Sequence, residues 1–217
     1  VQIYLERKIQ ALMQDRLGPL HTGPFGLLQT LADALKLLGK EDIRARATDK
    51  WFFLAAPLIV FSPMLASFVV LPFAPGIVGA DLNIGLLYLT TLGSMTVLGI
   101  VIAGWASNNK YSLIGGLRSA GQLVSYEVPQ ILSLVTVVLV TGSLSMVAIT
   151  ESQPGLLVNL LVLPLAFCTY LIAALAETNR NPFDLPEAES ELVAGFLTEY
   201  SGMRWGVFFL AEYGEVA

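Results

Sequence analysis

Long apolar stretches, separated by short polar segments, dominate the pattern of residues along this chain. Four of them, residues 51–74, 82–107, 120–150 and 152–177, are each long enough to cross the roughly 30 Å hydrocarbon layer of a bilayer as an α-helix. Uninterrupted apolar runs favour helices, because the strands of a membrane barrel alternate apolar and polar residues. The pattern therefore predicts an all-α integral membrane protein, a multi-span transmembrane helix bundle that forms one domain over residues 1–217.

Two shorter apolar pieces lie at the ends of the sequence. Residues 1–8 open with the run VQIYL and become charged at Glu6, and residues 204–217 turn apolar again after Arg204. A span takes roughly 20 apolar residues, more than either piece contains. We expect residues 1–8 to be the end of a first span and residues 204–217 to be the start of a further one, so that the chain is a fragment of a larger membrane subunit.

One segment, residues 24–38, has a helical pattern of a different kind. Apolar side chains follow one helix face and polar side chains the other. Pro24 suits the first turn of a helix and Gly39 suits its end. Because about 15 residues are too few to span, we expect an amphipathic surface helix, either a simple anchor or the wall of an internal cavity. The apolar face comprises Phe25, Leu28, Leu31, Leu35 and Leu38, and the polar face Gln29, Asp33, Lys36 and Lys40.

Composition and the distribution of basic residues agree with this architecture. The chain is 55% hydrophobic and 13% charged, with a mean hydropathy of +0.69, whereas soluble domains carry about 25% charged residues. Eight of the twelve Lys and Arg residues lie within the first 50 residues, and the others lie in or beside residues 107–118 and 178–203. By the positive-inside rule, these three regions face the cytoplasm or its equivalent.

The sequence carries no recognisable cofactor or metal motif. The single cysteine, Cys168, lies in an apolar run, and the single histidine, His21, lies in a Gly/Pro-rich stretch. Neither has the neighbouring ligands that a metal ion or an iron–sulfur cluster needs. No nucleotide-binding glycine fingerprint is present. We therefore expect no metal site, and no catalytic redox residue in this chain.

Three carboxylates, Glu127, Glu177 and Glu212, fall at membrane depth or at its border. A charge at that depth costs several kcal/mol unless it is paired or protonated. Desolvation also favours the neutral form of a carboxyl group, which is how proton-carrying acids are tuned. Three such residues suggest a proton path. The structural alternative is that each acid only pairs with Arg118, Lys110 or a tyrosine.

A segment rich in acids, residues 178–203, follows the fourth apolar run. Asp184 can cap a helix whose first turn contains Pro186 and Glu187. On that helix Glu187 and Glu191 are neighbours, and repulsion between their charges allows a proton to be shared. Leu, Val and Phe residues are interspersed with the acids, so we expect a buried or interfacial segment. The alternative is a solvated loop that contacts another subunit.

Five segments carry a resemblance to a known family: ERKIQALMQDRLGP, GPFGLLQTLADALKLLGKED, SNNKYSLIGGLRSAGQLVSYE, NPFDLPEAESELVAGFLTEYSG and AEY. In this order they resemble the H subunit (also called subunit 1), a membrane subunit of proton-pumping NADH–quinone oxidoreductases, the respiratory complex I family. The resemblance covers essentially the whole chain. Family members have eight spanning helices, so it implies that this chain holds the end of the first, the second to fifth, and the start of the sixth.

The resemblance also implies a function and a set of residues. Such a subunit joins the electron-transfer arm to the membrane arm and forms much of the quinone chamber. The matching chamber residues are Arg16, Phe25, Asp33, Phe196 and Tyr200. The acids that would accept or relay protons are Glu127, Glu177, Glu187, Glu189, Glu191, Glu199 and Glu212.

The implied cofactors and partners lie outside this chain. Quinone would be the substrate, and NADH, FMN and iron–sulfur clusters would belong to partner subunits. Expected partners are the iron–sulfur subunits next to the quinone, small membrane subunits, antiporter-like membrane subunits and the lipid bilayer, with no nucleic acid. The bacterial cytoplasmic membrane is the favoured location, with the thylakoid and the mitochondrial inner membrane as alternatives.

Two other functions fit part of the pattern. A membrane subunit of an energy-converting hydrogenase, or of a related complex, would share the acidic segment but use another donor or acceptor. A stand-alone proton-coupled transporter would also carry buried acids, but it would show inverted internal repeats, and no such repeat is evident. A pure scaffold would leave Glu127 and Glu212 unexplained.

Overall fold

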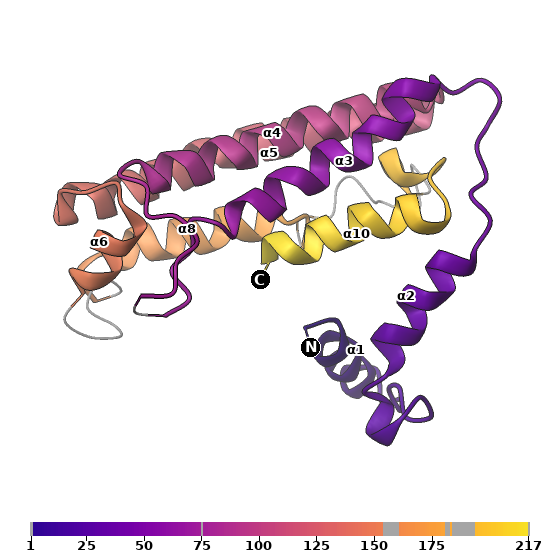
Figure 1. Cartoon of the computed structure of the whole chain (residues 1–217), viewed down its shortest axis with the longest axis horizontal. Helices are drawn as coiled ribbons and strands as arrows, with labels where there is room; N and C mark the ends of the chain where they lie inside the picture. The colour runs from indigo at the N-terminus through magenta and orange to yellow at the C-terminus, as the bar shows by residue number, and fades with distance from the viewer. Residues whose placement is uncertain (1, 75, 154–160, 181–182, 184–193, 217) are drawn as a thin grey trace. The chain divides into compact units, whose positions relative to one another are not determined.

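The chain is helical throughout most of the part that the computed structural model describes. That part comprises residues 2–74, 76–153, 161–180, 183 and 194–216. It contains eight α-helices and two short 3₁₀ helices (Figure 1), and its only β-structure is an isolated bridge between Ala74 and Ile77. Three of the helices are long and apolar enough to cross a membrane. The prediction of an all-α, multi-span membrane protein is confirmed.

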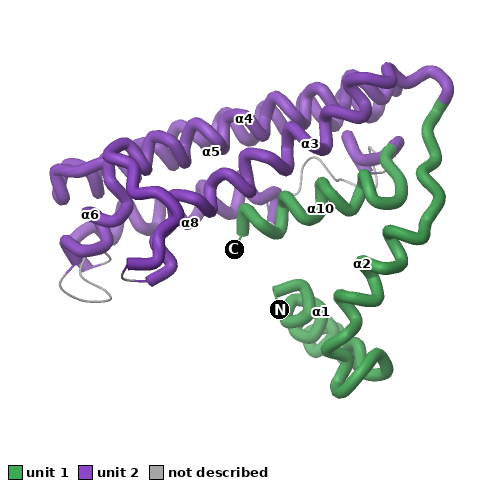
Figure 2. Tube along the Cα trace, in the orientation of Figure 1, with its two compact units in different colours: residues 1–45, 200–217 green, residues 46–199 purple. Residues whose placement is uncertain are grey.

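The residues form two compact units, Val1–Ala45 with Tyr200–Ala217, and Arg46–Glu199 (Figure 2). In the larger unit, α3, α4 and α5 are the helices that can cross a membrane, and each runs antiparallel to the next. The shorter apolar helix α8 packs along α5 (Figure 1). The helices of this unit are α3 (Lys50–Ser67), α4 (Gly85–Ala106), α5 (Lys110–Thr141), α6 (Met146–Glu151) and α8 (Pro164–Glu177), with the 3₁₀ helix η2 (Gly195–Leu197).

Side-chain caps determine where three of these helices begin. Asp49, Asn109 and Ser145 precede α3, α5 and α6, and each accepts a hydrogen bond from a backbone N–H of the first turn, at 3.3, 3.0 and 3.3 Å. The Asn109 cap starts α5 directly after α4. Lys110 and Arg118 therefore lie in the helix.

The other ends of the apolar runs also differ from the helix boundaries. α3 ends at Ser67, and residues 68–74 are not helical. α5 contains Pro129 and ends at Thr141, because Gly142 adopts a left-handed conformation (φ 71°) and its N–H caps the Val138 carbonyl at 2.7 Å. An apolar run thus marks a span without marking where its helix stops.

The larger unit has two chemically different ends. One end carries the caps of α3 and α5, together with an edge-to-face pair between Phe52 and Trp105 whose ring centroids are 5.4 Å apart. At the other end, the Ser145 hydroxyl donates to Asp81 at 2.9 Å. Aromatic rings near the ends of spans are typical of membrane interfaces. The assignment of the first end to the cytoplasmic side stays a prediction.

The smaller unit contains the surface helix that the sequence predicted. Its apolar residues Leu31, Leu35 and Leu38 are all exposed, as an amphipathic helix at a membrane or partner surface requires. The helix begins at Gln29 and not at Pro24, because Phe25 has a φ of 57° and breaks the first turn. The elements of this unit are α1 (Gln2–Met13), η1 (Pro24–Gly26), α2 (Gln29–Gly39) and α10 (Gly202–Val216).

Candidate functional site

Glu127 lies near the middle of α5, where it is partly buried against α4. The Ser94 hydroxyl of α4 donates a hydrogen bond to Glu127 Oε1. The sequence had suggested a position near the start of a span, but α5 begins at Lys110. A carboxylate inside a helix pair needs a donor from the neighbouring helix, and the serine supplies it.

Glu177 is the last residue of α8 and is also partly buried. The Gln130 amide of α5 donates a hydrogen bond to Glu177 Oε2. On the other side of this carboxylate lies Gly93 of α4, where an added Cβ would stand 3.2 Å from Oε1. The carboxylate therefore occupies space next to the α4 backbone that glycine leaves open.

The two carboxylates meet the same short stretch of α4. Glu177 contacts Gly93, and Glu127 bonds to the adjacent Ser94. Within the part of the chain that the structure describes, neither acid forms an ion pair with a Lys or Arg. We call the residues Gly93, Ser94, Glu127, Gln130 and Glu177 the carboxylate cluster.

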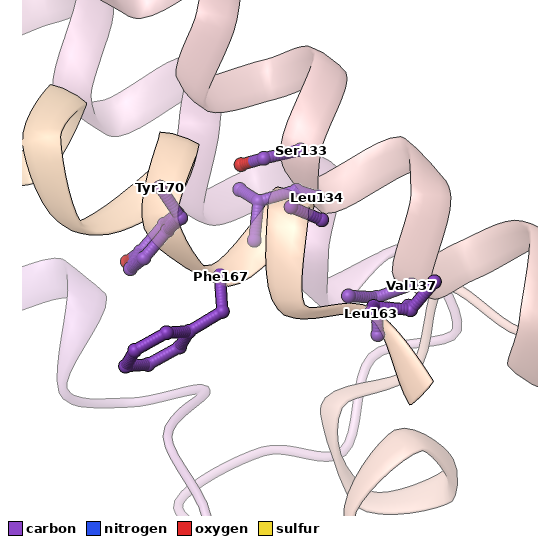
Figure 3. Close-up of a pocket in the computed structure, with 7 residues that line it drawn as sticks. Ser133, Leu134, Val137, Leu163, Phe167 and Tyr170 are labelled. Atoms are coloured by element: carbon purple, nitrogen blue, oxygen red, sulfur yellow. The ribbon is translucent and has the colours of Figure 1, made fainter. Parts of the chain in front are cut away.

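An apolar cavity of about 160 Å³ lies between α5 and α8 (Figure 3). Its walls include Leu134 and Val137 of α5, and Phe167 and Tyr170 of α8. The lining of this cavity is thus mostly hydrocarbon, with the hydroxyl groups of Ser133 and Tyr170 as its polar side-chain groups.

The end of the acidic segment is held against the start of α5. The Asn109 amide donates to Glu199 at 2.8 Å, and the Ser112 hydroxyl donates to the Phe196 carbonyl at 3.2 Å. A Cβ on Gly115 would lie only 2.6 Å from the Cα of Gly195. The two backbones approach so closely that a side chain on Gly115 is excluded.

The beginning of the acidic segment is held three turns further along α5. The Gln122 amide donates to the Phe183 carbonyl at 2.8 Å, and the Tyr126 and Phe183 rings pack edge to face at 5.3 Å. Ten residues of helix, about 15 Å, separate Ser112 from Gln122. The predicted relay residues Glu187, Glu189 and Glu191 lie outside the described residues, between these two attachments in the sequence.

The other predicted residues of the quinone chamber lie partly in the smaller unit. Arg16 and Phe25 are exposed, Phe25 to 76%, and the Phe25 carbonyl accepts a hydrogen bond from Tyr4 at 2.8 Å. Asp33 pairs with Arg7 at 2.5 Å, with side-chain exposures of 34% and 43%. The surface helix is thereby fastened to α1 by an ion pair.

Two predicted residues lie at the C-terminal end of the smaller unit. Tyr200 is buried and packs edge to face on Phe208, with ring centroids 4.9 Å apart. Glu212 is partly buried on α10, and the hydroxyl of the next residue, Tyr213, donates to Glu6 at 2.7 Å. In the larger unit, Phe196 is buried in η2.

Sequence reasoning missed the neutral partners of the acids. Ser94 and Gln130 were not singled out, and neither was Gln122, whose amide donates to the Phe183 carbonyl, although each is a polar residue within an apolar run. Such residues in spanning helices usually face the bundle interior. Arg7, which pairs with Asp33, was missed because nothing in the spacing links residues 26 positions apart.

Apolar helices long enough to span a bilayer, with carboxylates held at their contacts, define the class of protein: a polytopic α-helical membrane protein with ionisable groups inside its bundle. The chain matches the family model described as NADH dehydrogenase over residues 1–217, and it belongs to that family.

Curated relatives make the family assignment more specific. The chain is 54% identical over 214 residues to a protein of Dehalococcoides mccartyi (strain CBDB1), covering 99% of this chain and 60% of the relative. It is 56% identical over 211 residues to one of Brevibacillus brevis, covering 97% and 62%, and 53% identical over 221 residues to one of Chlorobaculum parvum, covering 99% and 62%. All three are named as the H subunit of NADH-quinone oxidoreductase. The resemblance to that subunit is confirmed, and the chain spans about three fifths of the length of these relatives.

Proposed function

We propose that this chain is part of the membrane subunit of a proton-translocating NADH–quinone oxidoreductase and couples quinone reduction to proton movement. Its relatives bear the name of such an enzyme. In this proposal the intramembrane acids Glu127 and Glu177 receive protons from the acidic segment and pass them on, with Glu212 in the same relay. The loop acids Glu187, Glu189, Glu191 and Glu199 respond to the charge on reduced quinone.

The carboxylate cluster is the observation that carries the proposal. Glu127 and Glu177 approach the same stretch of α4, and their partners are the neutral side chains Ser94 and Gln130. A hydroxyl or an amide can donate to a carboxylate and can also accept from a protonated acid. A Lys or Arg partner would favour only the ionised form. The cluster is thus suited to acids that change protonation state.

The quinone side of the proposal concerns Arg16, Phe25, Asp33, Phe196 and Tyr200. An exposed aromatic ring beside an amphipathic surface helix suits contact with an apolar quinone tail. The ion pair between Arg7 and Asp33 would keep that helix in place. This role rests on the family, and the exposure of Phe25 supports it.

Redox groups would be supplied by partner subunits in this proposal. Iron–sulfur clusters are held by several cysteine thiolates, and the sequence has one cysteine. NADH, FMN and the clusters would therefore belong to the peripheral arm. Small membrane subunits and antiporter-like subunits would continue the proton path, in a bacterial cytoplasmic membrane or an equivalent one.

Partner identification tests the assembly. The protein would be extracted from native membranes in mild detergent and its companions identified by mass spectrometry. Flavin, iron–sulfur and antiporter-like subunits are the expected result. A nickel–iron hydrogenase would instead indicate the related hydrogen-converting complexes, and recovery of the chain alone would favour a transporter.

A charge-neutralising substitution tests the relay. Glu127→Gln in the whole complex should lower proton uptake per quinone reduced and leave reduction of a soluble artificial acceptor intact. Glu151→Gln is the matched control, because Glu151 is an exposed acid at the end of α6. Equal proton uptake in the two variants would refute a relay through Glu127.

A further inference from the structure

Gln122 of α5 occupies a buried position where three parts of the chain meet. Its Nε2 group has two N–H bonds and donates to the Ala176 carbonyl at 2.7 Å, the Phe183 carbonyl at 2.8 Å and the Asn179 side-chain oxygen at 3.2 Å, with one N–H shared between two of these acceptors. The residue is 7% exposed. We propose that Gln122 is a positioning residue that clamps the junction between α8 and the acidic segment. The consequence for coupling rests on the relay proposed above.

Gln122 contacts the residues that end α8. The Arg180 N–H bonds to the Leu175 carbonyl at 3.1 Å, and the Asn179 N–H bonds to the Ala176 carbonyl at 3.3 Å, which is the Schellman pattern of a helix stop. Asn179 adopts the left-handed conformation that this stop requires (φ 48°). Gln122 donates to two members of the motif, so the helix ends where this side chain can reach it.

The same face of α5 continues from the junction towards the carboxylate cluster. Tyr126, one turn after Gln122, packs on Phe183, and Gln130, one turn further, donates to Glu177. Residues four apart share a helix face. Gln122, Tyr126 and Gln130, which lie one turn apart on this face, therefore hold both the last residue of α8 and the start of the acidic segment. Loss of the first contact would release the junction while the other two contacts remained.

The hydrogen-bond donors of Gln122, and not its volume, carry this role. Gln122→Met keeps an unbranched side chain of similar length but has no N–H donor. Gln122→Lys restores donors, and a cation is favoured at the carboxyl end of a helix such as α8. A pure packing role predicts that Met is tolerated and Lys is damaging. The clamp predicts that Met releases the junction and that Lys restores it at least in part.

The experiment uses the whole complex purified from native membranes. Hydrogen–deuterium exchange, followed by mass spectrometry, would report on the amides of Thr178, Asn179, Arg180 and Phe183. In Gln122→Met we expect exchange there to be at least about fivefold faster, as the loss of one net hydrogen bond implies. Ser125→Ala is the control, because Ser125 is exposed on the same helix and bonds only to its own turn.

A milder variant covers the case in which Gln122→Met fails to assemble. Asn179→Gly removes the side-chain acceptor at 3.2 Å, while glycine adopts the left-handed conformation more easily than asparagine and so offsets part of the loss. It should speed exchange at the same amides by a smaller factor. Unchanged exchange in Asn179→Gly would then overturn the clamp.

Proton uptake per quinone reduced would be measured on the same samples. It distinguishes a failure of the Gln122 clamp from a failure of the proposed proton relay. Faster exchange with lower uptake, both reversed by Lys, supports the clamp and its role in coupling. Faster exchange with unchanged uptake supports the clamp and overturns its role in coupling. Exchange no faster than in Ser125→Ala overturns the clamp and leaves the relay standing.

Discussion

Gly93→Ala is the most direct probe of the carboxylate cluster. The added methyl group would stand 3.2 Å from Glu177 Oε1, and among the described residues no other atom outside the local helix lies within 4 Å of it. The carboxylate must therefore move by a few tenths of an ångström, away from its present place between α4 and Gln130. Gly121→Ala is the matched control on α5, because an added Cβ there meets nothing within 4 Å.

The expected fall in proton uptake follows from the weakening of the hydrogen bond that Gln130 donates to Glu177. In both variants alanine favours the helix over glycine by about 1 kcal/mol, so this term cancels between them. A hydrogen bond to a charged group contributes about 1.5–3 kcal/mol. If displacement weakens the bond from Gln130 to Glu177 by half, the loss is about 0.7–1.5 kcal/mol, or roughly three- to twelvefold in a rate that depends on it.

The assay compares the two variants in sealed vesicles that contain the whole complex. Proton uptake driven by NADH and quinone should fall in Gly93→Ala and stay at the parental value in Gly121→Ala. Reduction of a soluble artificial acceptor should be equal in both. Adding Glu177→Asp to Gly93→Ala shortens the displaced side chain and should change uptake non-additively. If proton uptake in Gly93→Ala equals that in Gly121→Ala, the position of the Glu177 carboxylate does not affect proton uptake.

Three further substitutions test other parts of the structure. Ser94→Ala removes the donor to Glu127 and should lower proton uptake about two- to twelvefold without altering assembly, given about 0.5–1.5 kcal/mol for a hydrogen bond; unchanged uptake would contradict this role. Phe25→Ala should raise the KM for long-tailed quinones, because the ring is exposed beside the surface helix, and an equal effect on short-tailed quinones would exclude a contact with the tail. Gly115→Ala would place a Cβ 2.6 Å from Gly195 and should cost about 1–3 kcal/mol of stability, measurable as a lower Tm and less assembled complex; a parental Tm would contradict the close approach.

The elements of the fold could be predicted from sequence because the bilayer imposes their length and composition. Apolar runs without charge located α3, α4 and α5. Their boundaries could not be located in the same way, since they depend on single residues. Asn109 starts α5 directly after α4, and Phe25 delays α2 by its positive φ. Neither the cap nor the unusual backbone angle changes the hydropathy of the segment.

The acids of the site were visible in the sequence, whereas their partners were not. Glu127 and Glu177 stand out because charges are rare in apolar runs. Ser94, Gln122 and Gln130 are ordinary polar residues, and which of them meets an acid depends on how far each helix is rotated about its axis. That rotation is set by packing between segments distant in sequence, such as α4 against α5 and α5 against α8. Periodicity within one helix carries no information about it.

Pro129 has a mechanical consequence for α5. A proline has no N–H, so the Ser125 carbonyl, four residues earlier, receives no helical hydrogen bond from it, and the ring presses against that turn. The helix is therefore easier to bend in the turn from Ser125 to Pro129, which contains Glu127 and comes just before Gln130, the residue that donates to Glu177. A small bend in this turn changes the distance between the Ser94–Glu127 contact and the Gln130–Glu177 contact. Such a bend requires less energy here than in the neighbouring turns of α5.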